Sequence, residues 1–104
     1  MLNVLVATNE ELHIHIKLNG EYSVGFEFSA NLILSKKIDS VLRDAHLGSI
    51  TGSEAGGGFE SLFCEGPDAI AMYTVVRAVI PKWPDHSFAE LFSDGTKSRL
   101  ELQR

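Results

Sequence analysis

Two histidines stand two positions apart in a segment where polar and apolar residues alternate. The polar members are His13, His15 and Lys17, and the apolar members are Leu12, Ile14, Ile16 and Leu18. Alternate residues of a strand point to one face, and two neutral imidazoles on one face can share a metal ion. Further ligands would have to come from Glu11, Glu21, His46 or His86, since the chain has no Cys-x-x-Cys or His-Glu-x-x-His pattern. The solvent-facing side of a half-buried strand explains the same residues, so we predict neither a metal site nor a cofactor.

A glycine-rich tip, Glu54–Gly58, separates two short segments that contain apolar residues, Ser49–Ser53 and Phe59–Cys64. Backbone amides in such a tip can bind an anion. The tip lacks the lysine and the Ser/Thr of a phosphate-binding loop, and Glu54 would repel a phosphate. Glycines also supply the positive φ angles of a tight turn, so the sequence predicts a hairpin and leaves a further role of the tip open.

Cys64 and Trp83 are single residues of their kind. A thiol beside a histidine can be a nucleophile, but the apolar neighbours of Cys64 indicate a core residue. Trp83 stands between two prolines and has two interpretations, an exposed anchor for a partner or a cover for the core at a helix end. The carboxylates of Glu54, Glu60 and Glu65 are expected in solvent. No Gly-x-Ser-x-Gly motif is present, and we predict no catalytic residue.

Two helices are predicted from apolar residues at helical spacing. The first spans Asn31–His46, with Gly48 as the left-handed residue that ends it. The second spans Pro67–Ile80, with Pro67 in its first turn. Each helix has one apolar stripe, and the two stripes must find a common core. The residues predicted to be buried there are Ile38, Leu42, Met72, Val76 and Val79.

Strands are predicted on both sides of these helices. Beside the two hairpin segments they span Leu2–Ala7, Glu11–Leu18, Phe88–Phe92 and Arg99–Leu102, with a two-residue turn at Asp94-Gly95. Tyr22–Phe28 is predicted as a further strand or an extended link. The order predicts an α+β two-layer sandwich with both helices on one face of an antiparallel sheet. Leu2–Ala7 and Arg99–Leu102 are the expected edges.

Length and charge narrow the function classes. The chain has 104 residues and a net charge of −5, which indicates one domain, 1–104. An acidic protein is a poor ligand for a phosphate backbone, so we expect no nucleic acid partner and favour a basic protein. No apolar run approaches the ~20 residues of a membrane span. The N-terminus also lacks a signal-peptide pattern, so we expect a cytoplasmic protein with no membrane partner. The oligomeric state is not indicated.

The predicted layout resembles small bacterial ferredoxin-like α+β proteins, βαββαβ with additional edge strands. The resemblance covers roughly residues 34–92 and is carried by His46-Leu47-Gly48-Ser49-Ile50-Thr51-Gly52, by Gly56–Gly58 and by the helix from Pro67. Some such acidic proteins are immunity factors, so the resemblance implies an immunity-type protein that binds and neutralises a toxin. The function we expect is therefore a small non-catalytic protein-interaction domain. The alternatives are a metal- or small-ligand-binding domain using His13 and His15, and third a small enzyme.

Recognition is expected at a sheet edge or at the solvent-facing side of the sheet, because a domain of this size has little room for a deep cleft. The interaction residues that we predict are His13, His15, Lys17, Glu54, Glu60 and Trp83.

Overall fold

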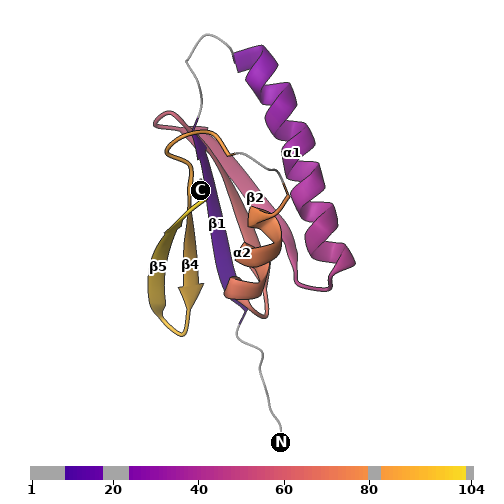
Figure 1. The fold of residues 1–104 in the computed structure, drawn as a ribbon, viewed down its shortest axis with the longest axis vertical. Coiled ribbons are helices and arrows are strands. Elements are labelled where there is room, and N and C mark those ends of the chain that lie inside the picture. The colour runs from indigo at the N-terminus through magenta and orange to yellow at the C-terminus, as the bar shows by residue number, and fades with distance from the viewer. Residues whose placement is uncertain (1–8, 18–23, 80–82, 103–104) are drawn as a thin grey trace, which may run out of the picture.

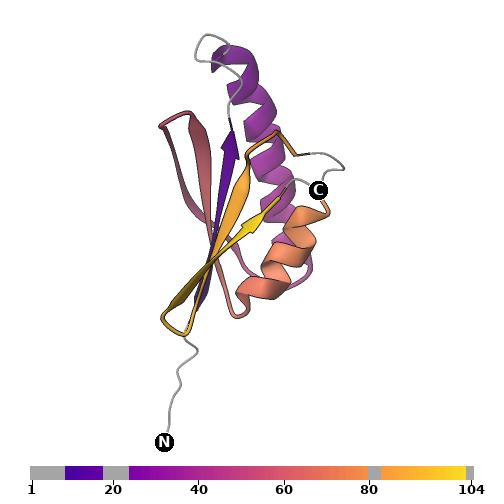
Figure 2. The ribbon, with the colours of Figure 1, turned by 60° about the vertical axis from the view of Figure 1, so that its left-hand side comes forward.

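A computed structural model describes residues 9–17, 24–79 and 83–102, with the backbone alone for 24–32. Within these residues the chain forms β1 (Glu10–Lys17), α1 (Val24–Asp44), β2 (Ser49–Gly56), β3 (Phe59–Gly66), α2 (Ala69–Arg77), β4 (Phe88–Ser93) and β5 (Thr96–Glu101) (Figure 1). The strands form one antiparallel sheet in the order β2-β3-β1-β4-β5. Both helices lie on the same face of it (Figure 2). The predicted α+β sandwich is confirmed, whereas the strand predicted over Leu2–Ala7 lies outside the described residues.

β1 is the central strand, paired with β3 on one side and β4 on the other. Its apolar residues point to the helices and are at most 1% exposed: Leu12, Ile14 and Ile16. This alternation is the period of two from which the strand over Glu11–Leu18 was predicted. The segment predicted over Phe88–Phe92 lies in β4. β5 starts before the predicted segment Arg99–Leu102 and ends at Glu101, one residue short of it, and β5 is an edge of the sheet as predicted.

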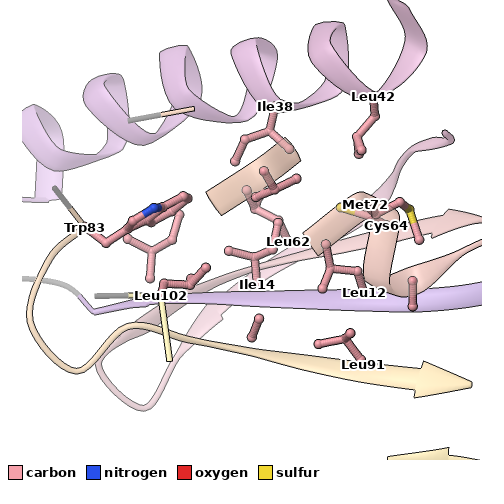
Figure 3. Packing of buried hydrophobic residues seen from close by; sticks show 14 residues of the cluster. Leu12, Ile14, Ile38, Leu42, Leu62, Cys64, Met72, Trp83, Leu91 and Leu102 are labelled. Atoms are coloured by element: carbon pink, nitrogen blue, oxygen red, sulfur yellow. The ribbon is translucent and has the colours of Figure 1, made fainter. Parts of the chain in front are cut away.

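The core fills the space between the sheet and the helices (Figure 3). Four of the residues predicted to be buried have no exposed surface: Ile38, Leu42, Met72 and Val76. The fifth, Val79, is partly buried against them. Trp83 is 2% exposed, and its indole N–H donates to the carbonyl of Arg77 at 3.1 Å. Of the two interpretations of Trp83, the core residue is therefore right and the exposed anchor is wrong.

α1 is longer than predicted. It has 21 residues and begins at Val24 rather than Asn31. The segment Tyr22–Phe28, predicted as a strand or an extended link, is therefore helical from Val24 onward. Three alternating apolar residues are too few to separate a period of two from one of 3.6. Among the described residues, neither this helix nor α2 is long and apolar enough to cross a bilayer.

The end of α1 is closed by a histidine. His46, and not the predicted Gly48, has the left-handed φ of 57°. The N–H of His46 donates to the carbonyl of Arg43 at 3.0 Å. The N–H of Leu47 donates to the carbonyl of Leu42 at 2.9 Å, and these two bonds form a Schellman motif. Gly48 is needed for a different reason, because a Cβ there would collide with the backbone of β3.

α2 begins after the proline rather than on it. Asp68 is the N-cap, and its Oδ1 accepts from a first-turn amide at 3.1 Å. Pro67 therefore precedes the helix, which starts later than the predicted range Pro67–Ile80. A second carboxylate, Glu10 of β1, accepts from the N–H of Ala69 at 2.7 Å. This bond ties the helix to the central strand.

Both hairpins turn on two residues with positive φ. The angles are 62° and 84° at Gly57 and Gly58, and 53° and 76° at Asp94 and Gly95. Positive φ at both central residues is typical of the type I′ turn. The turn predicted at Asp94-Gly95 is confirmed. The first turn is narrower than the predicted tip, because Glu54–Gly56 continue β2.

Candidate functional site

The residues of β1 that do not point to the helices point to the opposite side of the sheet. His13 pairs with Phe63 of β3 and with Glu90 of β4, and residues paired in this way point to the same side. We call this side the open face. Its central residues are Glu11, His13, His15, Lys17, Phe59, Ser61, Phe63, Phe88, Glu90 and Phe92. No helix of the described part of the chain lies over it (Figure 2).

Phenylalanines surround both histidines on the open face. The ring of His13 lies 4.7 Å from that of Phe63 and 4.5 Å from that of Phe92, centroid to centroid. The ring of His15 stacks on Phe88 at 4.6 Å and 28°. All five side chains are half-buried, although no helix or strand of the described residues lies over them. The aromatic rings therefore fix the position of both imidazoles.

One polar row crosses the open face from β3 to β5. Ser61 Oγ is 2.8 Å from His15 Nδ1, and His15 Nε2 is 2.8 Å from Glu90 Oε1. The other oxygen of Glu90 is 3.0 Å from Lys97 Nζ. Partial burial acts to raise the pKa of Glu90, but the hydrogen bonds from Lys97 and His15 outweigh it and lower the pKa below its usual value of 4.5. Glu90 is therefore ionised at neutral pH.

Serine, histidine and carboxylate in this order could carry out general-base catalysis. That chemistry also needs free N–H groups for the oxyanion. β3 is paired on both sides around Ser61, so its amides belong to the sheet ladder. The side chain is also only 8% exposed. We therefore assign no catalytic role to this row.

Three side chains of the open face could hold a metal ion. One imidazole nitrogen of His13, one of His15 and one carboxylate oxygen of Glu90 lie within 4.8 Å of one another. Sequence reasoning missed Glu90. The signal was present, because Phe88, Glu90 and Phe92 alternate in a predicted strand and so share one face. The strand order that places this face beside His13 could not be read from the sequence.

Four further residues were proposed as ligands: Glu11, Glu21, His46 and His86. His46 closes α1, and His86 is in the loop before β4. Glu11 is on the open face, where its Oε1 is 2.9 Å from His13 Nε2. Glu21 lies outside the described residues. Of the three that lie in the described part of the chain, Glu11 alone is in contact with the histidine pair.

Cys64 lies on the opposite side of the sheet, in the core. It has no exposed surface. Burial, with a smaller effect from the charge of Asp39, raises the pKa of the thiol to about 12. The thiol is protonated at neutral pH and is no nucleophile. The prediction of a core cysteine is confirmed.

The carboxylates near the hairpin are divided between the two faces. Glu54 is exposed and pairs with Ser61, so it extends the polar row of the open face onto β2. Glu60 pairs with Ile16 and points to the helix side. Glu65 is on the open face, 3.5 Å from the hydroxyl of Thr51. Lys17 places its Nζ 5.1 Å above the ring of Phe59.

Comparisons with models of protein families, with curated proteins and with solved structures found no match.

Proposed function

We propose that this chain is a small non-catalytic protein-interaction domain that binds its partner through the open face. The observation that carries the proposal is the set of four half-buried phenylalanines on a sheet side that no described helix covers: Phe59, Phe63, Phe88 and Phe92. Aromatic residues are enriched in protein interfaces, and grouped apolar residues at a surface mark binding sites.

Three long basic side chains lie over these rings. Lys17 lies over Phe59, Lys97 lies over Phe92 and Arg99 lies over Phe88. The Arg99 guanidinium is 3.8 Å from the ring centroid. Such side chains shield aromatic surface with their stems and keep the charge in water. A partner can displace them without unfolding the sheet, because they come from the solvent side. The open face is thus kept soluble and remains accessible to another protein.

The acidic net charge of the chain favours a partner with a basic rim, although three basic side chains lie over the phenylalanines of the open face. Glu11 and Glu54 are exposed on it, and the whole chain has a net charge of −5. Opposite charge on the partner would speed their encounter. An immunity-type protein that neutralises a toxin, acting in the cytoplasm, is the specific form of this proposal. The sequence supports it through the acidic charge and the resemblance.

We propose that this domain has a ferredoxin-like fold. β1 lies between β3 and β4, and β2 lies outside β3. Each helix therefore links two strands that have a third strand between them, the split βαβ arrangement. β5 is then an additional edge strand. These features support a βαββαβ arrangement with one strand added.

The test is a binding experiment with matched variants. Immobilised wild-type protein is incubated with an extract of its source cells, beside Phe92→Glu and Ile70→Glu. Ile70 is 65% exposed on α2, on the other side of the sheet. We expect a partner that binds the wild type and Ile70→Glu and is lost with Phe92→Glu. Circular dichroism shows whether each variant is folded.

Hydrogen exchange of the wild-type protein with the recovered partner then maps the contact. Protection should fall on residues 11–17, 59–65 and 88–93. Protection confined to α1 and α2, or equal loss of binding with both variants, would contradict the proposal.

A further inference from the structure

We propose that His13, His15 and Glu90 form a binding site for a divalent transition-metal ion, with Zn²⁺ as the ion that the donor set fits best. Two imidazoles and one carboxylate are the ligands of three-residue zinc sites, which keep a further position for water. The three residues come from two neighbouring strands and lie on one side of the sheet. The site is independent of the protein-interaction proposal, since it needs no partner.

The spacing of the donor atoms is close to what coordination requires. With bonds of about 2.0–2.1 Å in a tetrahedral site, neighbouring ligand atoms are about 3.3–3.4 Å apart. His15 Nε2 and Glu90 Oε1 are 2.8 Å apart. His13 completes the set within 4.8 Å. For an ion to be held by all three residues, the His13 nitrogen has to approach the other two donor atoms by roughly 1.5 Å or less.

Neighbouring groups already orient two of the three ligands. When a metal ion replaces the contact between His15 Nε2 and Glu90 Oε1, Ser61 Oγ, 2.8 Å from His15 Nδ1, can accept the Nδ1–H and leave the Nε2 lone pair for the metal. Lys97 holds the second oxygen of Glu90 at 3.0 Å. This outer shell distinguishes the group from three residues that merely lie close together.

His13 has an outer partner as well. Glu11 Oε1 is 2.9 Å from His13 Nε2. A carboxylate that accepts from a metal-bound histidine fixes its ring and raises its basicity. The phenylalanines on both sides restrict the ring further, with Phe63 and Phe92 within 4.7 Å of it, centroid to centroid. The remaining coordination position would face the solvent side of the sheet, where water can occupy it.

Calorimetric titration of the chelator-treated full chain with Zn²⁺ tests the site. We expect one equivalent to bind the wild type, and Glu90→Gln to weaken binding by at least about tenfold. The matched control is His86→Gln, which removes a histidine from a loop outside the group and should leave the affinity unchanged. Weak binding that Glu90→Gln does not alter, or binding that is lost with His86→Gln, would overturn the proposal.

A second measurement uses only the wild type, in case Glu90→Gln does not fold. The ring resonances of all four histidines are followed by NMR during the same Zn²⁺ titration. The signals of His13 and His15 should shift together and saturate at one equivalent, while those of His46 and His86 stay in place. Shifts at His46 or His86 alone, or no shift at any histidine, would show that the metal does not bind at the open face.

Discussion

The two sides of β1 are built from alternate residues of one eight-residue strand, and they differ in what they contact. On the helix side, Leu12, Ile14 and Ile16 are at most 1% exposed and belong to the apolar core. On the open face, His13 and His15 are half-buried among aromatic rings and pair with carboxylates and a hydroxyl. Stability should therefore depend on one side, and binding on the other.

The largest effect should come from a cavity on the helix side. Ile14 has no exposed surface, so Ile14→Ala removes buried methyl and methylene groups and leaves a void. We expect it to lower the free energy of unfolding by about 2–5 kcal/mol. Its matched control is the preceding residue, in the variant His13→Ala. This variant should cost about 1 kcal/mol or less, because the half-buried side chain opens to solvent and its removal leaves no enclosed cavity. Urea denaturation of both variants measures the difference. Equal losses would show that the open face is part of the stabilising core.

Two glycines of the first hairpin, Gly56 and Gly66, differ in how closely other backbone atoms approach them. A Cβ on Gly66 would collide with the carbonyl of Leu47, whereas a Cβ on Gly56 would meet nothing within 4 Å. We therefore expect Gly66→Ala to cost about 1–3 kcal/mol through displaced backbone. Gly56→Ala should change the free energy of unfolding by less than about 1 kcal/mol. The change should be an increase if alanine reduces the conformational freedom of the unfolded chain. Thermal unfolding of the two variants checks this. A destabilised Gly56→Ala beside an unaffected Gly66→Ala would contradict the close contact.

The features that could be predicted from sequence are those fixed by local physics. Alternating polar and apolar residues predicted β1, and the residues Asp94-Gly95 predicted the turn of the second hairpin. Apolar residues at helical spacing predicted that Leu42 and Met72 are buried. The start of α1 could not be predicted, because a short run of alternating apolar residues fits both periods. Neither could its end, since His46 adopts the left-handed conformation usual for glycine and Gly48 is reserved for close contact with β3.

The candidate site was harder to predict because it depends on strand order. His13 and His15 are close in sequence, and their shared face was predicted from the period of two. Glu90 follows them by more than seventy positions and becomes their neighbour only because β4 pairs with β1. Trp83 differs from Glu90, because it was singled out from the sequence but its role was not decided. Its place between two prolines fitted an exposed anchor as well as a core residue, and only packing decides between them.

The smallest expected effect comes from the charges of Glu54 and Glu60. Reversing each charge in turn compares the two sides of the sheet without changing the apolar contacts. Glu54 and Glu60 are six positions apart in one hairpin, but Glu54 pairs with Ser61 on the open face and Glu60 pairs with Ile16 on the helix side. Glu54→Lys and Glu60→Lys change the net charge by the same amount. If the partner binds the open face, Glu54→Lys should slow association several-fold and change dissociation little.

Glu60→Lys should have a weaker effect on the same rate, because its charge lies on the other side of the sheet. Surface plasmon resonance at low and at physiological salt measures both variants. The difference between them should shrink as salt is added, since screening at physiological ionic strength acts beyond about 8 Å. Equal slowing by both variants would mean that only net charge matters to the encounter, and a larger effect of Glu60→Lys would place the partner on the helix side.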